Sequence, residues 1–126
     1  MKYSTLLLIL IFLISCTNSP IKKNKSSYIP YKSSGFALIY NSNLHKNEKF
    51  YKKINNDKFE IAHYLLPKNS VLKITNPLNM KSIELKVTKK IKFSPFYKIL
   101  ISQKVADKLE LNREMPFVEV IERKKK

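Results

Sequence analysis

Glycine is almost absent from this chain, which has one glycine, Gly35, among its 126 residues. Phosphate-binding loops and dinucleotide-binding turns each need several glycines, because the backbone must approach the phosphate closely. The sequence therefore excludes both kinds of nucleotide site. Turns need another residue that tolerates positive φ, and asparagine is the next most tolerant. We expect such turns at the Asn-rich segments 41–43, 55–57 and 76–79.

Cysteine is equally rare, since Cys16 is the only one in the sequence. A single cysteine allows no disulfide within the chain, so packing alone must hold the fold. One cysteine and the 2 histidines make no recognisable zinc-site pattern. We therefore expect no metal and no other cofactor.

Acidic residues are few, with 9 Asp and Glu against 25 Lys and Arg and a net charge of +16. A charge of this size favours anionic partners. Only 2 of the basic residues are arginines, the side chain best suited to bidentate phosphate contacts. A bias of the coding sequence is an alternative explanation of the charge, because Lys, Asn and Ile are all abundant.

Long apolar runs are lacking except near the N-terminus, where residues 6–14 follow the positively charged Lys2. The run is too short to span a bilayer, which needs roughly 20 apolar residues. A positive start, a short apolar core and a small residue at its end are typical of a secretory signal. The string Leu13-Ile14-Ser15-Cys16 resembles the lipobox of bacterial lipoproteins. This resemblance implies a signal peptide at residues 1–15 and acylation of Cys16, the new N-terminus.

The lipobox implies an exported protein tied to a membrane by its N-terminal lipid. Thr17, which is not an aspartate, follows the lipidated position. In bacteria that sort lipoproteins by this residue, it resembles an address for the periplasmic face of the outer membrane; the inner membrane is the alternative. An exported protein does not meet nucleic acid, so the anions within reach are lipid headgroups and peptidoglycan carboxylates. The sequence does not indicate the oligomeric state.

The pattern of the remaining chain predicts a flexible tether at 16–34, one domain at 35–121 and a basic tail at 122–126. Apolar residues alternate with polar ones in the middle of the domain, which is typical of half-buried strands. Ser102 is expected to N-cap a short helix at 103–111. Segment 41–58 is expected to be a long loop, after which 59–66 returns to the core. Strands are expected at 36–40, 71–75, 83–87, 98–101 and 116–121, which together suggest a small β-barrel with one or two short helices.

Several motifs of the domain, taken in order, resemble the rare lipoprotein A (RlpA) family of septal ring lytic transglycosylases. The resemblance covers residues 35–121 and implies a six-stranded double-psi β-barrel. It also implies endolytic cleavage of peptidoglycan glycan strands from which the stem peptides have been removed. The motifs are Gly35–Tyr40, Ala62-His63 with Leu66-Pro67, Val71–Asn76 with Asn79 and Ser82, Tyr97–Ser102 with Ala106 and Leu109, and Pro116–Val120.

The resemblance also implies two catalytic aspartates, and this chain has neither. Lys89 and Leu100 stand at the matching positions. Cleavage without water needs a group that protonates the leaving oxygen, and a carboxylate is the usual choice. Lysine holds its proton too firmly at neutral pH, and leucine has none to give. The remaining catalytic candidates are His63, which the family shares, and Glu60, the nearest acid; His63 as a core or rim residue is the alternative.

Glycan binding can persist where catalysis is lost. Aromatic faces stack on sugar rings, and ammonium groups suit the carboxylates of muramyl residues. We therefore expect a catalytically degenerate lipoprotein that binds peptidoglycan glycan strands. The alternatives are an active lytic transglycosylase with His63 and a relocated acid, and a structural envelope protein whose basic face meets a membrane or a protein. The expected glycan-binding residues are Tyr40, Tyr64, Lys89, Lys90, Lys92 and Tyr97, with Phe93 and Phe96 either near the cleft or in the core.

Overall fold

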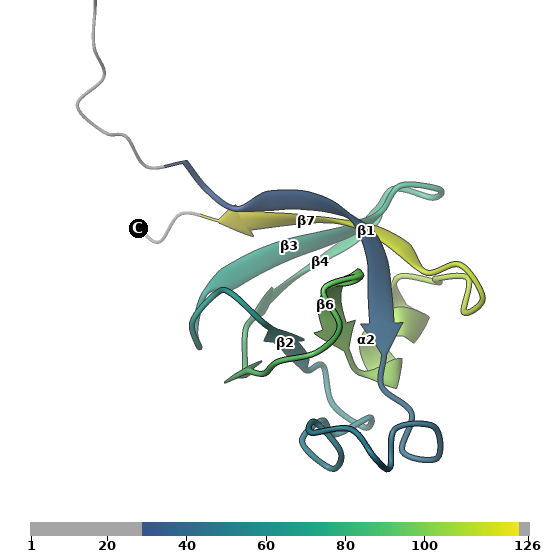
Figure 1. Ribbon diagram of the computed structural model, residues 1–126. Coiled ribbons are helices and arrows are strands. Elements are labelled where there is room, and N and C mark those ends of the chain that lie inside the picture. The colour runs from purple at the N-terminus through teal and green to yellow at the C-terminus, as the bar shows by residue number, and fades with distance from the viewer. Residues whose placement is uncertain (1–28, 124–126) are drawn as a thin grey trace, which may run out of the picture.

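The protein is mainly β and forms one curled sheet with a single short helix in the part described by a computed structural model, residues 29–123. The strand order is β4-β3-β7-β1-β6-β2-β5, and Figure 1 shows the sheet wrapping round on itself. The mainly-β prediction is thus confirmed. The strands are β1 (Lys32–Ile39), β2 (Ile61–His63), β3 (Val71–Asn76), β4 (Lys81–Lys86), β5 (Lys89–Lys90), β6 (Tyr97–Ile101) and β7 (Phe117–Arg123), and helix α2 spans Gln103–Lys108.

The concave side of the sheet holds the larger core. Successive side chains of a strand point to opposite faces, so alternate residues reach this core. Helix α2 closes one side of it with two buried residues, Val105 and Ala106. Burial of the apolar side chains in this core is the main stabilising contribution to the fold. The sheet supplies Ala37, Ile61, Leu72, Ile74, Ile99, Ile101, Val118 and Val120.

A second, smaller core lies on the opposite face of the sheet. Leu100 points there because its neighbours in β6 point to the first core, and it is fully buried. The long segment between β1 and β2 covers this face with Phe50 and Ile54. The expectation of a loop at 41–58 is confirmed, because no strand or helix forms there. Its weak apolar pattern did not reveal that two of its side chains are buried.

Strands β4 and β5, at the two edges of the sheet, belong to one continuous segment, residues 81–90. The two residues between them are also hydrogen bonded. Val87 donates its N–H to the carbonyl of Ser70 (2.8 Å), and Thr88 donates its N–H to the carbonyl of Ile61 (2.9 Å). One segment therefore pairs with β3 at one edge and with β2 at the other, which requires a strongly curled sheet.

The first and last strands of the chain are longer than the sequence suggested. Strand β1 begins at Lys32, inside the expected tether, and β7 ends at Arg123, inside the expected tail. The two ends pair with each other, Lys32 opposite Ile121, so each polar stretch is ordered by a partner far away in the sequence. The predicted cap of α2 is confirmed, because the side chain of Ser102 accepts the N–H of Val105. No helix among residues 29–123 is long and apolar enough to cross a membrane.

The asparagines form turns, but not in the way expected. Among residues 29–123, those with positive φ are Lys52, Asn69, Met80 and Glu110, and none of them lies in the Asn-rich segments at 41–43, 55–57 and 76–79. In those segments the side chains of Asn41 and Asn55 instead accept backbone N–H groups two residues later, both at 2.9 Å, and Asn76 accepts that of Leu78 at 3.1 Å. Such side-chain turns need no left-handed backbone. The expectation of positive φ was therefore wrong for all three segments.

Candidate functional site

The pairing of β2 with β5 brings together the positions that the family resemblance marks as functional. The two strands are parallel, with Ala62 opposite Lys89 and His63 opposite Lys90. A residue at position 89 is thus a neighbour of the histidine strand although 26 residues separate it from His63 in the numbering. In this chain the position carries an ammonium group where the resemblance implies a carboxylate.

His63 is completely buried, with an exposed fraction of 0%. Its Nδ1 accepts the backbone N–H groups of Leu65 and Leu66, each at 3.0 Å. An accepting Nδ1 carries no proton, so the neutral ring has its proton on Nε2. Nε2 has no hydrogen-bond partner among the described residues. The imidazole stacks on Tyr64 with the ring centroids 5.0 Å apart, and it meets Tyr31 edge-on at 4.8 Å.

Burial lowers the pKa of His63 to about 4, and the charge of Glu122 opposes this shift only in part. The ring is therefore neutral at physiological pH. Without exposed surface it cannot touch a polymer bound outside the protein. His63 thus orients the turn after β2, which is the second of the two roles expected of it, and it does not form a catalytic site at the surface.

Glu60 lies apart from His63. Its Oε1 accepts the N–H of Asn55 at 2.9 Å, and its side chain borders a hollow of about 490 Å³ with Lys52, Lys53 and Lys89. Glu122 is the acid whose charge acts on His63. The two catalytic candidates, Glu60 and His63, are therefore not brought together.

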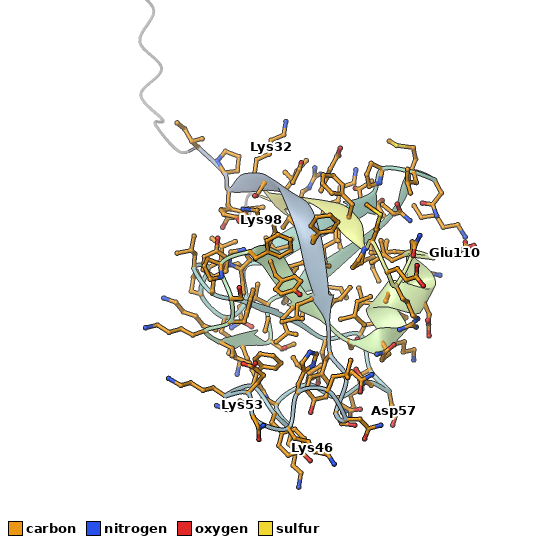
Figure 2. All side chains as sticks on the ribbon, turned by 45° about the vertical axis from the view of Figure 1, so that its right-hand side comes forward. Lys32, Lys46, Lys53, Asp57, Lys98 and Glu110 are labelled. Atoms are coloured by element: carbon orange, nitrogen blue, oxygen red, sulfur yellow. The ribbon has the colours of Figure 1, made fainter. Side chains whose placement is uncertain are left out.

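The three lysines expected to bind glycan, Lys89, Lys90 and Lys92, are all exposed. Lys89 donates from Nζ to the carbonyl of Lys53 at 2.6 Å, which holds its ammonium group over the hollow. Figure 2 shows the neighbouring Lys53 and Lys46 at the end of the molecule opposite Lys32, where β1 begins. The basic hollow therefore faces away from the start of the domain.

The three tyrosines expected to bind glycan lie in three different places. Tyr40 is only 3% exposed, and its hydroxyl accepts the N–H of Lys52 at 2.8 Å. No sugar ring can stack on it, so that expectation was wrong. Side chains of segment 41–58 cover Tyr40, and the weak apolar pattern of that segment did not predict this packing. Tyr64 is half-buried between His63 and Phe93. Tyr97 is half-buried and borders a separate groove.

No protein-family model matches the chain, and no curated protein is similar enough to be counted as a relative. The RlpA resemblance therefore stays a prediction from the motifs. Cys16, the expected lipidation site, lies outside the described residues. Within residues 29–123, no three His, Cys, Asp or Glu side chains lie close enough together to hold a metal ion.

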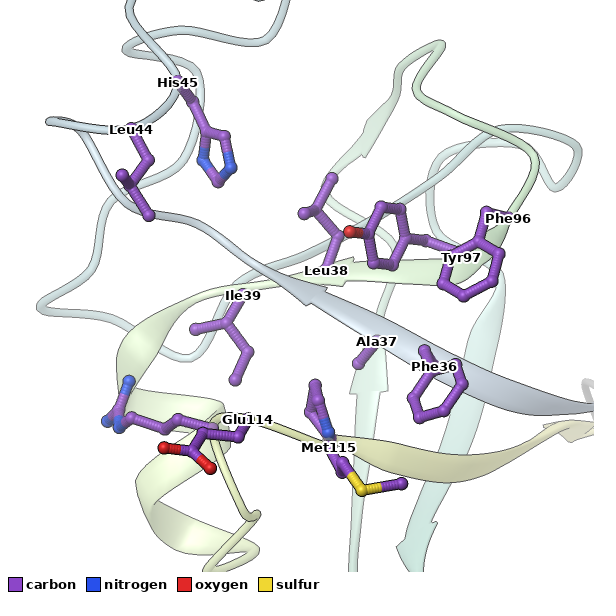
Figure 3. A pocket seen from close by; sticks show the side chains of 12 residues that line it. Phe36, Ala37, Leu38, Ile39, Leu44, His45, Phe96, Tyr97, Glu114 and Met115 are labelled. Carbon is purple, nitrogen blue, oxygen red and sulfur yellow. The ribbon is translucent and has the colours of Figure 1, made fainter.

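The groove beside Tyr97 contains residues that the sequence did not single out. It has a volume of about 350 Å³ and lies along the second half of β1, between Phe96 and Met115 (Figure 3). His45 and Leu44 close one end of it. The only signal in the sequence was a set of apolar residues in polar loops, and their convergence depends on the tertiary structure.

Proposed function

We propose that this protein is a lipid-anchored envelope protein whose RlpA-like barrel binds peptidoglycan glycan strands without cutting them. The lipid on Cys16 would hold it at the periplasmic face of the outer membrane, or at the inner membrane in a host with other sorting rules. The observation that carries the proposal is the β2–β5 pair. It joins two of the three positions that the family resemblance marks as functional, but one carries Lys89 and the other a buried His63.

The strand arrangement supports a double-psi barrel. If β4 and β5 are counted as one bent strand, six strands follow one another round a ring, and the segment 81–90 joins its two ends. Six is the number that the family resemblance implies. Two parallel pairs, β1 with β6 and β2 with β5, lie among otherwise antiparallel neighbours.

The chemistry of the two substituted positions supports binding over cleavage. Leu100 is completely buried in the second core, so it presents nothing to a ligand. Lys89 is exposed and carries an amine where the family resemblance implies the carboxylate that glycosidic cleavage normally uses. It can pair with the carboxylate of a muramyl residue.

The hollow around Lys89 is a suitable surface for such a strand. Lys52, Lys53 and Lys89 supply positive charge, and Glu60 supplies an acceptor for sugar hydroxyls. The described salt bridges involve Lys81, Arg113 and Arg123, so none of them neutralises a lysine of the hollow. Exposed charges of this kind act over a Debye length of about 8 Å at physiological salt, so retention on glycan should weaken as salt rises.

The direct test incubates the full-length lipidated protein, in detergent, with glycan strands stripped of their stem peptides. Co-sedimentation measures retention, and mass spectrometry of the strands detects 1,6-anhydro ends. We expect retention without anhydro ends. We also expect the double variant Lys53→Ala/Lys89→Ala to bind about tenfold more weakly, as the loss of two ion pairs of about 0.7 kcal/mol each implies.

Lys108→Ala is the matched control, because Lys108 is an exposed lysine of α2 outside the hollow. Retention that falls equally in Lys108→Ala would show nonspecific charge binding, as expected for a structural protein with a basic face. Anhydro ends that disappear in Glu60→Gln would show that the protein is an active transglycosylase with a relocated acid. A Cys16→Ala variant that stays in the membrane fraction would contradict the lipid anchor.

A further inference from the structure

The groove along β1 follows the edge of a strand. Four consecutive residues border it, Phe36 to Ile39. Successive side chains of a strand point to opposite faces, so a groove on one face would be bordered by every second residue. The pairing of β1 with β6 is irregular between Phe36 and Ala37, but Ala37, Leu38 and Ile39 follow in regular register and all three border the groove. The groove therefore lies at the edge of the strand, where the backbone groups point.

The second half of β1 has no strand on this edge among the described residues. Strand β7 pairs with β1 only from Lys32 to Phe36. The last contact is the bond from the N–H of Ala37 to the carbonyl of Pro116 at 2.8 Å, after which the two chains separate. The β6 side of β1 stays paired as far as Ile39.

The direction of the free backbone groups follows from the alternation of the ladder. Tyr40 donates its N–H to the carbonyl of Ile101 in β6, whereas Ala37 donates to the opposite side. Ile39 lies between these positions and shares the orientation of Ala37. Its N–H and C=O therefore point into the groove, and neither has a hydrogen-bond partner on that side among residues 29–123.

Exposed apolar side chains from three separate segments converge on this edge. Leu44 is 77% exposed, Phe96 is 61% exposed and Met115 is 62% exposed, and Figure 3 shows them around the strand. Phe96 also stacks on Phe36, with the ring centroids 5.5 Å apart, so its position is fixed. Exposed apolar residues that gather in one place mark a binding surface, whereas single ones carry no such meaning.

We propose that this groove binds an extended segment of another protein, which pairs with the backbone of Ile39 as an added strand. Strand addition uses main-chain hydrogen bonds for affinity and pockets for alternate side chains for specificity. One row of the segment's side chains would contact Phe96 and Tyr97, and the other row would contact Met115. The segment should therefore be apolar at alternate positions.

A peptide fits the groove better than a sugar. A sugar needs several side-chain groups for its hydroxyls, and the groove has few that are free. Arg113 is held by Asp107 and Gln103. His45 uses Nδ1 to accept the N–H of Asn41 at 3.0 Å. The N–H and C=O of Ile39, by contrast, face the groove and are available to the backbone of a peptide.

The test selects peptides from a phage-displayed library of random linear sequences against the full-length protein in detergent. Selected peptides are then synthesised, and their affinities are measured by fluorescence anisotropy. We expect a consensus with apolar residues at alternate positions. Backbone amide resonances of residues 36–39, 96–97 and 113–115 should shift when the peptide binds. Enrichment of no sequence, or shifts confined to other residues, would overturn the proposal.

Three variants separate the backbone contact from the apolar contacts. Ile39→Pro removes the N–H that faces the groove and leaves the bonds to β6, a position where an edge strand tolerates proline. We expect this variant to bind the peptide about tenfold more weakly, because it loses one hydrogen bond to the peptide and the proline ring prevents the closest approach of the two backbones. Because Ile39→Pro can also disturb the core, Phe96→Ser and Met115→Ser serve as surface variants that keep the fold.

Leu78→Ser is the matched control, since Leu78 is 82% exposed and does not border the groove. Its affinity for the peptide should equal that of the unchanged protein. Equal affinity of Met115→Ser, Phe96→Ser and Leu78→Ser would refute the groove as the binding site. If glycan strands shift the amide resonance of Ile39 and no peptide does, the groove is a sugar subsite and the proposal is wrong. Loss of glycan retention in the Lys53/Lys89 variant is a separate outcome, so each proposal can fail without the other.

Discussion

Acid should destabilise this protein through His63. In the folded state the ring is buried and neutral, and its pKa is about 4, whereas an unfolded histidine has a pKa of 6.5. As the pH falls below 6.5, the unfolded chain takes up a proton at this position and the folded chain does not. The stability that His63 contributes is therefore fully present above pH 6.5 and is lost as the pH falls towards 4.

The size of the effect follows from the difference between the two pKa values. One pKa unit corresponds to about 1.4 kcal/mol. Between about pH 7.5 and pH 4, the free energy of unfolding should therefore fall by about 3 kcal/mol because of this group alone. That is a large part of the roughly 5–15 kcal/mol that stabilises a typical domain.

The assay measures urea unfolding at several pH values in a protein with one titrating histidine. The chain has 2 histidines, so His45→Asn leaves His63 alone. The comparison protein also carries His63→Asn, whose side-chain oxygen can accept the N–H groups of Leu65 and Leu66. Carboxylates titrate in both proteins, so their contribution cancels in the comparison. Only the protein that keeps His63 should lose a further 3 kcal/mol or so of unfolding free energy at low pH. Parallel pH profiles would refute the neutral, buried state of His63.

Three further changes test the packing of the curled sheet and its helix by urea unfolding at neutral pH. Ser102→Ala removes an N-cap whose hydroxyl also donates to the carbonyl of Lys58 at 2.6 Å, and it should cost about 2 kcal/mol; an unchanged midpoint would exclude the cap as a stabilising contact. Gly35→Ala would place a Cβ 2.7 Å from Cγ of Lys98 and should lower the free energy of unfolding by about 1–2 kcal/mol. A second change, Lys98→Ala, should restore most of that loss, and additive losses in the double variant would contradict the clash. Asn76→Ala removes a buried amide that donates to the carbonyl of Leu109, at the end of α2, at 2.9 Å, and it should lower the free energy of unfolding by about 1–3 kcal/mol. A loss below about 0.5 kcal/mol would count against this role.

The sequence predicted several of the strands and the start of the helix. Alternation at 71–75 and 83–87 predicted the strands that form β3 and β4, and Ser102 predicted the start of α2. These features depend on neighbours in sequence, because strand alternation and helix capping act within a few residues. Val87 is the exception. It continues the alternation but leaves β4, because its backbone bonds to Ser70 where the sheet curls.

The candidate site was harder to predict from the sequence, because the residues that form it are far apart in the chain. Tyr40 looked available for a sugar, but Phe50 and Ile54 cover it from a segment with little apolar pattern. His63 looked catalytic, but two backbone N–H groups and two tyrosine rings enclose it. Burial of a polar side chain is decided by which distant segments pack on it, and periodicity does not report that.

The sequence by itself determined the β-rich class, the helix cap, the excluded nucleotide sites and the presence of Lys89 and Leu100 where the family resemblance implies acids, because each depends on residue type or local spacing. The tertiary structure alone decided that Lys89 lies beside the histidine strand and that His63 is neutral and enclosed. It also decided that Leu44, Phe96 and Met115 meet at the free edge of β1. Each of these depends on contacts between remote segments, since curling of the sheet sets which edges and loops become neighbours.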